Sequence, residues 1–407
     1  MKVITLLGEA WLLTCGAVWL VLFALSMIGV PWSLIALLIG LVLVSLSALR
    51  PLPSALPKLQ WPRLAWPNAI DLITLALIAG YLKLATVSSP VETDYITIWG
   101  LEGKTFWLHR GIDWQFLQTN LNPNAHVDYP VLVPLVYVAQ ALLFGAWAER
   151  AIGLITAGFG IAALLVVRGL LADEMPKLAR AAATLVLMPL VFSPFIGLAE
   201  GPLIAYAVAG VLFIRRGNLT RGAIYLGLAA CCKNEGLPIL VAVVIAMLAA
   251  REWRKLPRLW PMFVLPLPWL ILIRAYHLTT VDHLQSGVLT RLASRIANPA
   301  PLLRALADNP VGNPLFWLGV AAAIAIGWRQ VAKERVLAFV ALLQPLFFLF
   351  VYFITSRELD WLIRWSWSRI IRQAMPVAAL LALFCILPIV IALPHASEHT
   401  SDQGTDR

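Results

Sequence analysis

Apolar segments that are long enough to cross a lipid bilayer follow one another along most of the chain. Runs of about 17 to 22 apolar residues recur between residues 3 and 393, and a helix of that length spans a hydrocarbon core of about 30 Å. Strands of a membrane barrel would instead alternate apolar and polar residues over about ten positions. The pattern predicts an all-α polytopic membrane protein with about 11 to 13 membrane-spanning helices in one domain, 1–393.

The first apolar run, 3–29, resembles a signal peptide because it begins close to the N-terminus. It is longer than the apolar region of a signal peptide, and no convincing small-residue cleavage site follows it. We expect this run to be a retained membrane helix with the N-terminus in the cytoplasm.

Two polar stretches stand out from the apolar pattern. The longer one, 90–130, contains Trp99, Trp107 and Trp114, and tryptophan favours the boundary between lipid and water. We expect an extracytoplasmic loop whose short helices lie in this interface. The final stretch, 394–407, is expected to be a disordered cytoplasmic tail.

Composition and charge agree with a membrane protein. Apolar residues make up 61% of the chain and charged residues 13%, whereas soluble domains are about a quarter charged. The net charge is +10, but the basic residues gather in short loops, among them 215–221, 251–255 and 328–335. The positive-inside rule explains these loops as cytoplasmic, so the charge does not indicate a nucleic-acid partner.

The sequence does not decide which of two neighbouring apolar runs crosses the membrane. Apolar runs at 131–148, 151–170 and 181–198 follow the 90–130 loop. Three spans would disagree with the sides assigned to the flanking loops, so one of the first two runs dips into the membrane or lies along it. The sequence does not say whether 131–148 or 151–170 is the span.

The cysteines and histidines give no sign of a metal centre. The four cysteines lie within or beside apolar runs, and the six histidines are scattered. This spacing fits small buried hydrophobic residues better than a disulfide framework or a set of metal ligands. No cofactor and no metal site are predicted, although a divalent cation stays an open alternative.

The stretch VETDYITIWGLEGK, 91–104, places acids among aromatic residues just where the chain leaves an apolar run. A carboxylate walled by Tyr95 and Trp99 would lose solvation and gain basicity, as a general base requires. Asp94, with Glu92 nearby, is therefore the candidate base. The alternative is an ordinary interfacial acid in an outward loop.

Two further groups of polar residues lie at the edges of apolar runs. In HVDYP, His126 and Asp128 precede a run, and capping of the following helix would by itself account for Asp128. Glu200, Lys233 and Glu235 interrupt or begin other runs. Charges at membrane depth are usually functional, but an ion pair that fixes helix packing explains these three equally well.

The segment 355–373 carries four arginines, including Arg369 and Arg372, among several tryptophans. By alternation of the spans it lies outside the cytoplasm, which departs from the positive-inside rule. Arginine binds phosphate with paired donors, and indole rings stack on sugar faces or lipid chains. The alternative is an amphipathic helix that rests on anionic headgroups.

The sequence also resembles a known family. The residues that carry the resemblance are DYITIWGLEGKTFWLHRGID (94–113), HVDYPVLVPLVYVAQALLFG (126–145), GLAEGPLIAYA (197–207), CCKNEGLPI (231–239) and ELDWLIRWSWSRIIRQAMP (358–376). They are similar to the integral-membrane glycosyltransferases of the GT-C superfamily. The nearest branch is the bacterial one related to lipopolysaccharide-core sugar transferases, aminoarabinose transferases and protein O-mannosyltransferases.

The resemblance implies a GT-C-like fold and a polyprenyl-phosphate sugar as donor. It assigns the role of base, or of a group that orients the acceptor, to Asp94, and the donor phosphate to Arg369, with Arg372 and Lys233 in support. Two positions depart from the family pattern, because related sequences more often have Asp where Glu200 stands and proline where Val127 stands.

Together these arguments predict an inverting glycosyltransferase in the bacterial inner membrane, with its active site facing the periplasm. It would move a hexose or pentose from a polyprenyl-phosphate donor to a hydroxyl of a cell-envelope glycan, lipid or protein. The alternative is a transporter or flippase for a lipid-linked or anionic substrate. Besides the catalytic Asp94, the predicted substrate-binding residues are Glu92, Lys104, His126, Asp128, Tyr129, Glu200, Lys233, Glu235, Trp367, Arg369 and Arg372.

Overall fold

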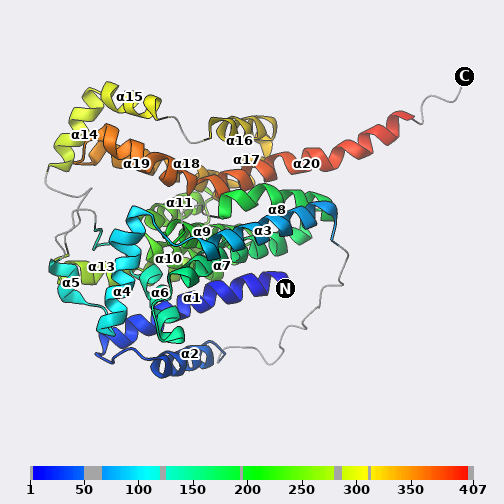
Figure 1. The fold of residues 1–407 in the computed structure, drawn as a ribbon. Coiled ribbons are helices and arrows are strands. Elements are labelled where there is room, and N and C mark those ends of the chain that lie inside the picture. The colour runs from blue at the N-terminus through cyan, green and yellow to red at the C-terminus, as the bar shows by residue number, and fades with distance from the viewer. Residues whose placement is uncertain are drawn as a thin grey trace, which may run out of the picture. The chain divides into compact units, whose positions relative to one another are not determined.

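A computed structural model describes residues 3–49, 67–119, 125–192, 196–278, 287–309 and 313–401. The described residues form helices and no strands (Figure 1). The chain divides into two compact units: unit 1 comprises Met1–Leu240 and Pro257–Gln285, and unit 2 comprises Val241–Leu256 and Ser286–Arg407. The prediction of an all-helical chain is therefore confirmed.

The helices of unit 1 are α1 (Val3–Met27), α2 (Leu34–Leu49), α3 (Ala69–Val87), η1 (Tyr95–Trp99), α4 (Gly100–His109), α5 (Trp114–Thr119), α6 (Leu132–Phe144), α7 (Glu149–Leu170), η2 (Leu171–Asp173), α8 (Lys177–Val191), α9 (Glu200–Arg215), α10 (Leu219–Cys232), η3 (Asn234–Gly236), α12 (Pro261–Val264) and α13 (Leu267–Ala275). The boundary between the units passes through α11 (Leu237–Ala249) and η4 (Trp253–Leu259). Those of unit 2 are α14 (Val288–Ala297), α15 (Ala300–Asp308), α16 (Pro314–Ile326), α17 (Trp328–Val331), α18 (Arg335–Ile354), α19 (Leu359–Arg372) and α20 (Met375–Ser401).

Several helices are compatible with a membrane protein. Among the described residues, four helical segments are long and apolar enough to cross a bilayer: Val3–Met27, Ala69–Val87, Glu149–Asp173 and Arg335–Ile354. The number rises to six if each of two bent helix pairs counts as one span. Shorter apolar helices, such as α6 and α10, add to these. The total of about 11 to 13 spans stays a prediction.

The core of unit 1 is a bundle in which α1, α7, α9 and α10 pack together. The buried Tyr206 of α9 donates its hydroxyl to the carbonyl oxygen of Leu12 in α1, at 2.8 Å. On α10, Tyr225 donates to Glu9 of α1 at 2.8 Å, and Arg221 pairs with the same carboxylate. A buried carboxylate is stable only with such partners, so these bonds fix how the apolar helices meet.

The direction of the helices gives unit 1 two distinct ends. Helices α3 and α7 are antiparallel, because Gly153 near the start of α7 packs against Ala85 near the end of α3, while Arg168 near the end of α7 pairs with Asp71 at 2.6 Å. We name the second region, where Glu174 follows α7, the Glu174 end. The opposite region, which contains the end of α10 and the start of α9, is the Lys233 end.

Helix α6 belongs entirely to the Lys233 end. Gly103 of α4 lies beside Pro134, near the start of α6, and beside Trp147, just after its end. Figure 1 shows α4 and α6 side by side at one end of α1 and α7. With 13 residues, α6 is also shorter than a span of about 20 residues requires. Of the two runs left open by the sequence, 151–170 therefore forms the long candidate span and 131–148 does not.

Unit 2 has its own hydrophobic core, to which the arginine-rich helix α19 contributes. The buried residues of this core are Leu302, Ala305, Phe348, Tyr352, Ile363, Trp367 and Ile371. Helix α14 is tied to the end of α18, because Arg291 and Arg295 donate to the carbonyl oxygens of Ile354 and Tyr352, both at 2.8 Å. These arginines satisfy carbonyl groups that a helix end leaves without partners.

The last helix is longer than the sequence suggests. Helix α20 continues to Ser401, so the tail that we expected to be disordered over 394–407 begins as a helix. Pro394 does not end α20, although proline removes one backbone donor and usually breaks a helix interior. Residues 402–407 lie outside the described part of the chain.

Candidate functional site

The Lys233 end owes its shape to a break between two apolar helices. Helix α10 stops at Cys232, Lys233 is extended with φ −163°, and the short η3 turns the chain into α11. Gly236 makes this turn possible, because a Cβ atom there would lie 2.6 Å from the carbonyl oxygen of Ala229. The sequence CCKNEG therefore places a lysine and a glutamate on one tight turn at the end of a buried helix.

Lys233 is a buried cation held by two carboxylates. Its ammonium nitrogen lies 3.1 Å from Oε1 of Glu200 and 2.8 Å from Oε1 of Glu235. The side chains of Lys233 and Glu200 are 2% and 3% exposed. A charge at this depth needs partners that replace water, and two carboxylates supply them. The ion pair predicted as the structural alternative for these residues is thus present, and it is buried.

The start of α9 brings the Asp94 segment to the same end of unit 1. Gly197, three residues before Glu200, has φ +84°, a conformation that favours glycine. A Cβ atom there would lie 2.7 Å from the ring of Tyr95, the neighbour of Asp94. Asp94 itself is half-buried at the start of η1. Residues that are far apart in the sequence therefore converge on the Lys233 end.

Aromatic rings cover Lys233 on one side. Its nitrogen lies 5.7 Å from the ring centre of Tyr129, a distance at which a cation is attracted to the ring face. Tyr129 in turn stacks on His126 at 4.6 Å and on the fully buried Trp99 at 5.4 Å. Both aromatic residues of the HVDYP motif, His126 and Tyr129, thus belong to this layer of rings.

Asp128 connects this aromatic layer to the turn after α10. Asn234 donates its side-chain amide to Oδ2 of Asp128 at 3.2 Å, and the indole of Trp269 donates to the carbonyl oxygen of Asp128 at 3.0 Å. Helix α6 starts only after Val131, which makes no side-chain cap. Asp128 therefore lies outside the first turn of α6, and its side chain holds the loop to η3.

Glu102 is a member of this region that the sequence argument missed. It is 2% exposed on α4, and its Oε2 atom makes no hydrogen bond. Burial, together with the nearby charge of Asp128, raises the pKa of Glu102 well above the ordinary value of a glutamate. The available signal was its position one helical turn after Ile98 and Trp99, which puts it on the same buried face of the segment.

Glu149, at the start of α7, is a second residue that the sequence argument missed. The Tyr95 hydroxyl donates to the Glu149 carboxylate, and the indole of Trp147 donates to the same residue at 3.1 Å. Burial and the acceptance of this bond by a carboxylate raise the pKa of Tyr95. Tyr95 is therefore an anchor between η1 and α7, next to the half-buried Asp94.

The other predicted site residues fall into two groups. Glu92 is half-buried just before η1, and Lys104 is exposed on α4. Trp367, Arg369 and Arg372 lie together on α19 of unit 2. Trp367 is in the core of that unit, with its ring 5.7 Å from that of Tyr352, whereas both arginines are half-buried.

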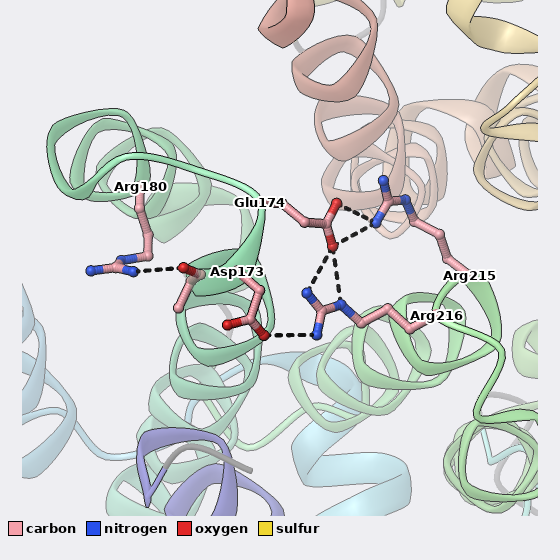
Figure 2. Close-up of polar contacts among 6 residues, drawn as sticks. Asp173, Glu174, Arg180, Arg215 and Arg216 are labelled. Carbon is pink, nitrogen blue, oxygen red and sulfur yellow. Dashed lines mark hydrogen bonds and ion pairs between the residues drawn. The ribbon is translucent and has the colours of Figure 1, made fainter. Parts of the chain in front are cut away.

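The Glu174 end has a different chemistry. Glu174 accepts hydrogen bonds from Arg215 and Arg216, and Arg216 also reaches Asp173 at 3.4 Å (Figure 2). Arg180 donates to a backbone carbonyl of the same turn. Each arginine thus holds the ends of neighbouring helices together, which accounts for much of the positive charge in this region without a ligand.

No group of three or more His, Cys, Asp and Glu side chains with metal-binding geometry occurs in the part of the chain that the structure describes. All four cysteines are buried and free. Comparison of this chain with protein-family models, with curated proteins and with solved structures finds no match. The functional argument therefore depends on the residues of the Lys233 end and on the chemistry they allow.

Proposed function

We propose that this protein is an inverting membrane glycosyltransferase. It would transfer a hexose or pentose from a polyprenyl-phosphate donor to a hydroxyl group of a cell-envelope glycan, lipid or protein. The observation that carries the proposal is the buried Lys233, paired with Glu200 and Glu235 and covered by Tyr129, at the same end of unit 1 as Asp94. Ionisable side chains buried among membrane helices are by default candidates for a functional site.

In the proposed reaction, the acceptor hydroxyl gives its proton to the carboxylate of Asp94. The acceptor oxygen attacks the anomeric carbon from the side opposite the phosphate, and the carbon–oxygen bond to the phosphate breaks with its electron pair on the phosphate. Cations lower the barrier by stabilising this growing charge, and electrostatic stabilisation of this kind often contributes most to catalysis. The family resemblance assigns this role to Arg369, with Arg372 or Lys233 in support.

The proposed sidedness rests on the positive-inside rule, applied to four arginines of unit 1. Arg168, Arg180, Arg215 and Arg216 belong to the Glu174 end. Under the positive-inside rule this end lies in the cytoplasm, so the Lys233 end would face the periplasm of a bacterial inner membrane. A lipid-linked donor exposed on that face would supply the sugar without a nucleotide.

The test uses purified full-length protein and a synthetic polyprenyl phosphate that carries a radiolabelled sugar, with an extract of cell-envelope glycolipids as acceptor. Wild type should release free polyprenyl phosphate and label the acceptor. Asp94→Asn should lower the rate about 10²-fold or more, because general bases contribute on this order.

The matched control is Asp173→Asn, which removes a carboxylate that is 62% exposed at the Glu174 end. This variant should retain the wild-type rate. An Asp94→Asn protein that folds and transfers sugar as fast as Asp173→Asn would disprove the role of Asp94. A wild-type protein that releases no lipid phosphate would disprove the proposed function itself.

A transporter for a lipid-linked or anionic substrate is the second candidate. The observation in its favour is the same buried Lys233 between two carboxylates, since intramembrane charges also line substrate pathways. Transporters, however, place their binding groups near the middle of the membrane. The cluster described here lies where α10 ends and α9 begins, which favours the enzyme.

A further inference from the structure

Helix α14 of unit 2 exposes its apolar face and turns its two arginines inward. Leu289, Ala293 and Ile296 recur at the spacing of one helical face. This face is open, because Leu289 is 79% exposed and Ile296 is 62% exposed. Arg291 and Arg295 are half-buried on the inner side of the helix. An exposed apolar face of this kind marks a contact with lipid or with another protein.

The bonds between α14 and α18 place α14 at the level where α18 ends. Arg291 and Arg295 donate to the carbonyl oxygens of Ile354 and Tyr352, both at 2.8 Å, and these carbonyls belong to the last turn of α18. Helix α18 is one of the segments that are long and apolar enough to cross a bilayer. The end of such a span lies where the hydrocarbon core meets the headgroups, so α14 is held at that boundary.

The neighbouring helices α15 and α19 carry the same kind of surface. Leu303 on α15 is 58% exposed, and Trp365 on α19 is 68% exposed. Trp361, four residues before Trp365, is also exposed and shares a face of α19 with it. Both helices contribute to the core of unit 2 together with the end of α18. Because tryptophan is enriched at the boundary between lipid and water, these helices favour lipid as the partner of the α14 face.

Charges beside this surface come in pairs of opposite sign. On α15, Arg304 is followed one helical turn later by Asp308, and both are exposed. On α19, Arg364 lies 2.5 Å from Asp360. An interfacial helix is attracted to a membrane by burial of its apolar face and by charge. Because these charges are balanced, we expect apolar burial to supply the attraction here.

We propose that α14 is an interfacial helix that inserts Leu289, Ala293 and Ile296 into the lipid leaflet in which α18 ends. The ligand of the exposed face is thus phospholipid, at the boundary between acyl chains and headgroups. On the opposite side of α14, Arg291 and Arg295 satisfy carbonyl groups that the end of α18 leaves without helical partners.

The sequence before α18 gives the side of the membrane. The basic stretch 328–335 leads into α18, and the positive-inside rule assigns such a stretch to the cytoplasm. The end of α18, and α14 with it, would therefore lie at the extracytoplasmic leaflet. This lipid-binding surface goes beyond the proposed sugar transfer and does not depend on it.

Site-directed fluorescence in the full-length protein tests the placement of α14. Single cysteines at the exposed positions 289, 290, 293, 294 and 296 each carry an environment-sensitive fluorophore, and each variant is reconstituted into phosphatidylcholine vesicles. Wild type, whose four cysteines are buried, gives the background of labelling. Ser294→Cys is the matched control for Ile296→Cys, because Ser294 is exposed on the polar side of the same helix.

A nitroxide attached to the lipid near the headgroup should quench the labels at 289, 293 and 296, whereas iodide in the water should quench those at 290 and 294. Iodide quenching of Ile296→Cys as strong as that of Ser294→Cys would overturn the proposal. So would protection of Ile296→Cys from both quenchers, because protein, such as a second copy of the chain, would then cover the face.

Two further measurements test the apolar basis of the contact. The pair Leu289→Asn and Ile296→Asn should expose a label at 293 to iodide, whereas the control pair Thr290→Asn and Ser294→Asn should leave its quenching unchanged. Addition of phosphatidylglycerol to the vesicles should also leave the pattern unchanged. Equal effects of the two pairs, or lipid quenching that appears only with the anionic lipid, would overturn the proposal.

Discussion

Replacement of Lys233 by methionine tests how the Lys233 end is held together. The substitution shortens the unbranched side chain by one atom and removes its charge, so Glu200 and Glu235 lose the cation at 3.1 and 2.8 Å. At an effective dielectric constant of about 20, each contact amounts to roughly 5 to 6 kcal/mol of Coulomb attraction before desolvation is subtracted. Removal of one partner of a buried pair destabilises proteins by about 3 to 5 kcal/mol.

We expect Lys233→Met to lie at the upper part of that range, because Glu200 is 3% exposed and cannot recover its charge stabilisation from water. The free energy of unfolding, measured by denaturant titration in mixed micelles, gives the value. The triple variant Lys233→Met, Glu200→Gln, Glu235→Gln should recover most of the loss, since no uncompensated charge remains.

Lys255→Met is the matched control. Its ammonium lies 3.0 Å from Glu252, but the two side chains are 52% and 36% exposed. A solvated pair of this kind contributes about 1 kcal/mol or less. If Lys233→Met unfolds at the same free energy as Lys255→Met, or if the triple variant is no more stable than Lys233→Met, the assignment of the ion pair as a structural element of the site is wrong.

Two further substitutions test neighbouring parts of the same end. Glu102→Gln should stabilise the protein above the ordinary glutamate pKa, because the raised pKa makes the folded wild type bind a proton that the unfolded chain releases. The difference in the free energy of unfolding between variant and wild type should grow by about 1.4 kcal/mol per pH unit until Glu102 ionises in the folded state. The difference should vanish at acidic pH. An equal free energy of unfolding at all pH values would contradict the raised pKa of Glu102. Gly236→Ala should destabilise the turn after α10, because the new methyl group would lie 2.6 Å from the carbonyl oxygen of Ala229. Amide hydrogen exchange in residues 233–240 measures the loss, and exchange at the wild-type rate would contradict the close packing.

The helical architecture was predictable from the sequence because length and hydrophobicity are local properties. The apolar runs at 3–29 and 151–170 correspond to α1 and α7 within a few residues. The interruption at Lys233 was also visible, since two charges and an asparagine broke an apolar stretch. Its three-dimensional consequence, a salt bridge to Glu200 on another helix, needed the packing of α9 against α10.

The parts that sequence reasoning missed depend on tertiary contacts. The position of Glu102 on the buried face of α4 could have been inferred from the sequence, but the nearby charge of Asp128 and the bond from Tyr95 to Glu149 depend on tertiary contacts. From the sequence alone, the segment that forms α6 could not be distinguished from a membrane span. In the structure, Gly103 of α4 lies beside Pro134, near the start of α6, and beside Trp147, just after its end. The continuation of α20 to Ser401 was also not predicted, because a proline at position 394 usually indicates that a helix has ended.

Reconstitution of the protein into vesicles that contain a radiolabelled polyprenyl-phosphate sugar tests the central claim most directly, because chemistry and movement can be followed in one sample. With the glycolipid acceptor in the same vesicles, the account predicts that wild type generates free polyprenyl phosphate together with a labelled acceptor, and that Asp94→Asn forms both products about 10²-fold or more slowly while still inserting into the vesicles. Movement of intact lipid-linked sugar across the bilayer, without release of polyprenyl phosphate, would contradict the account and identify a transporter.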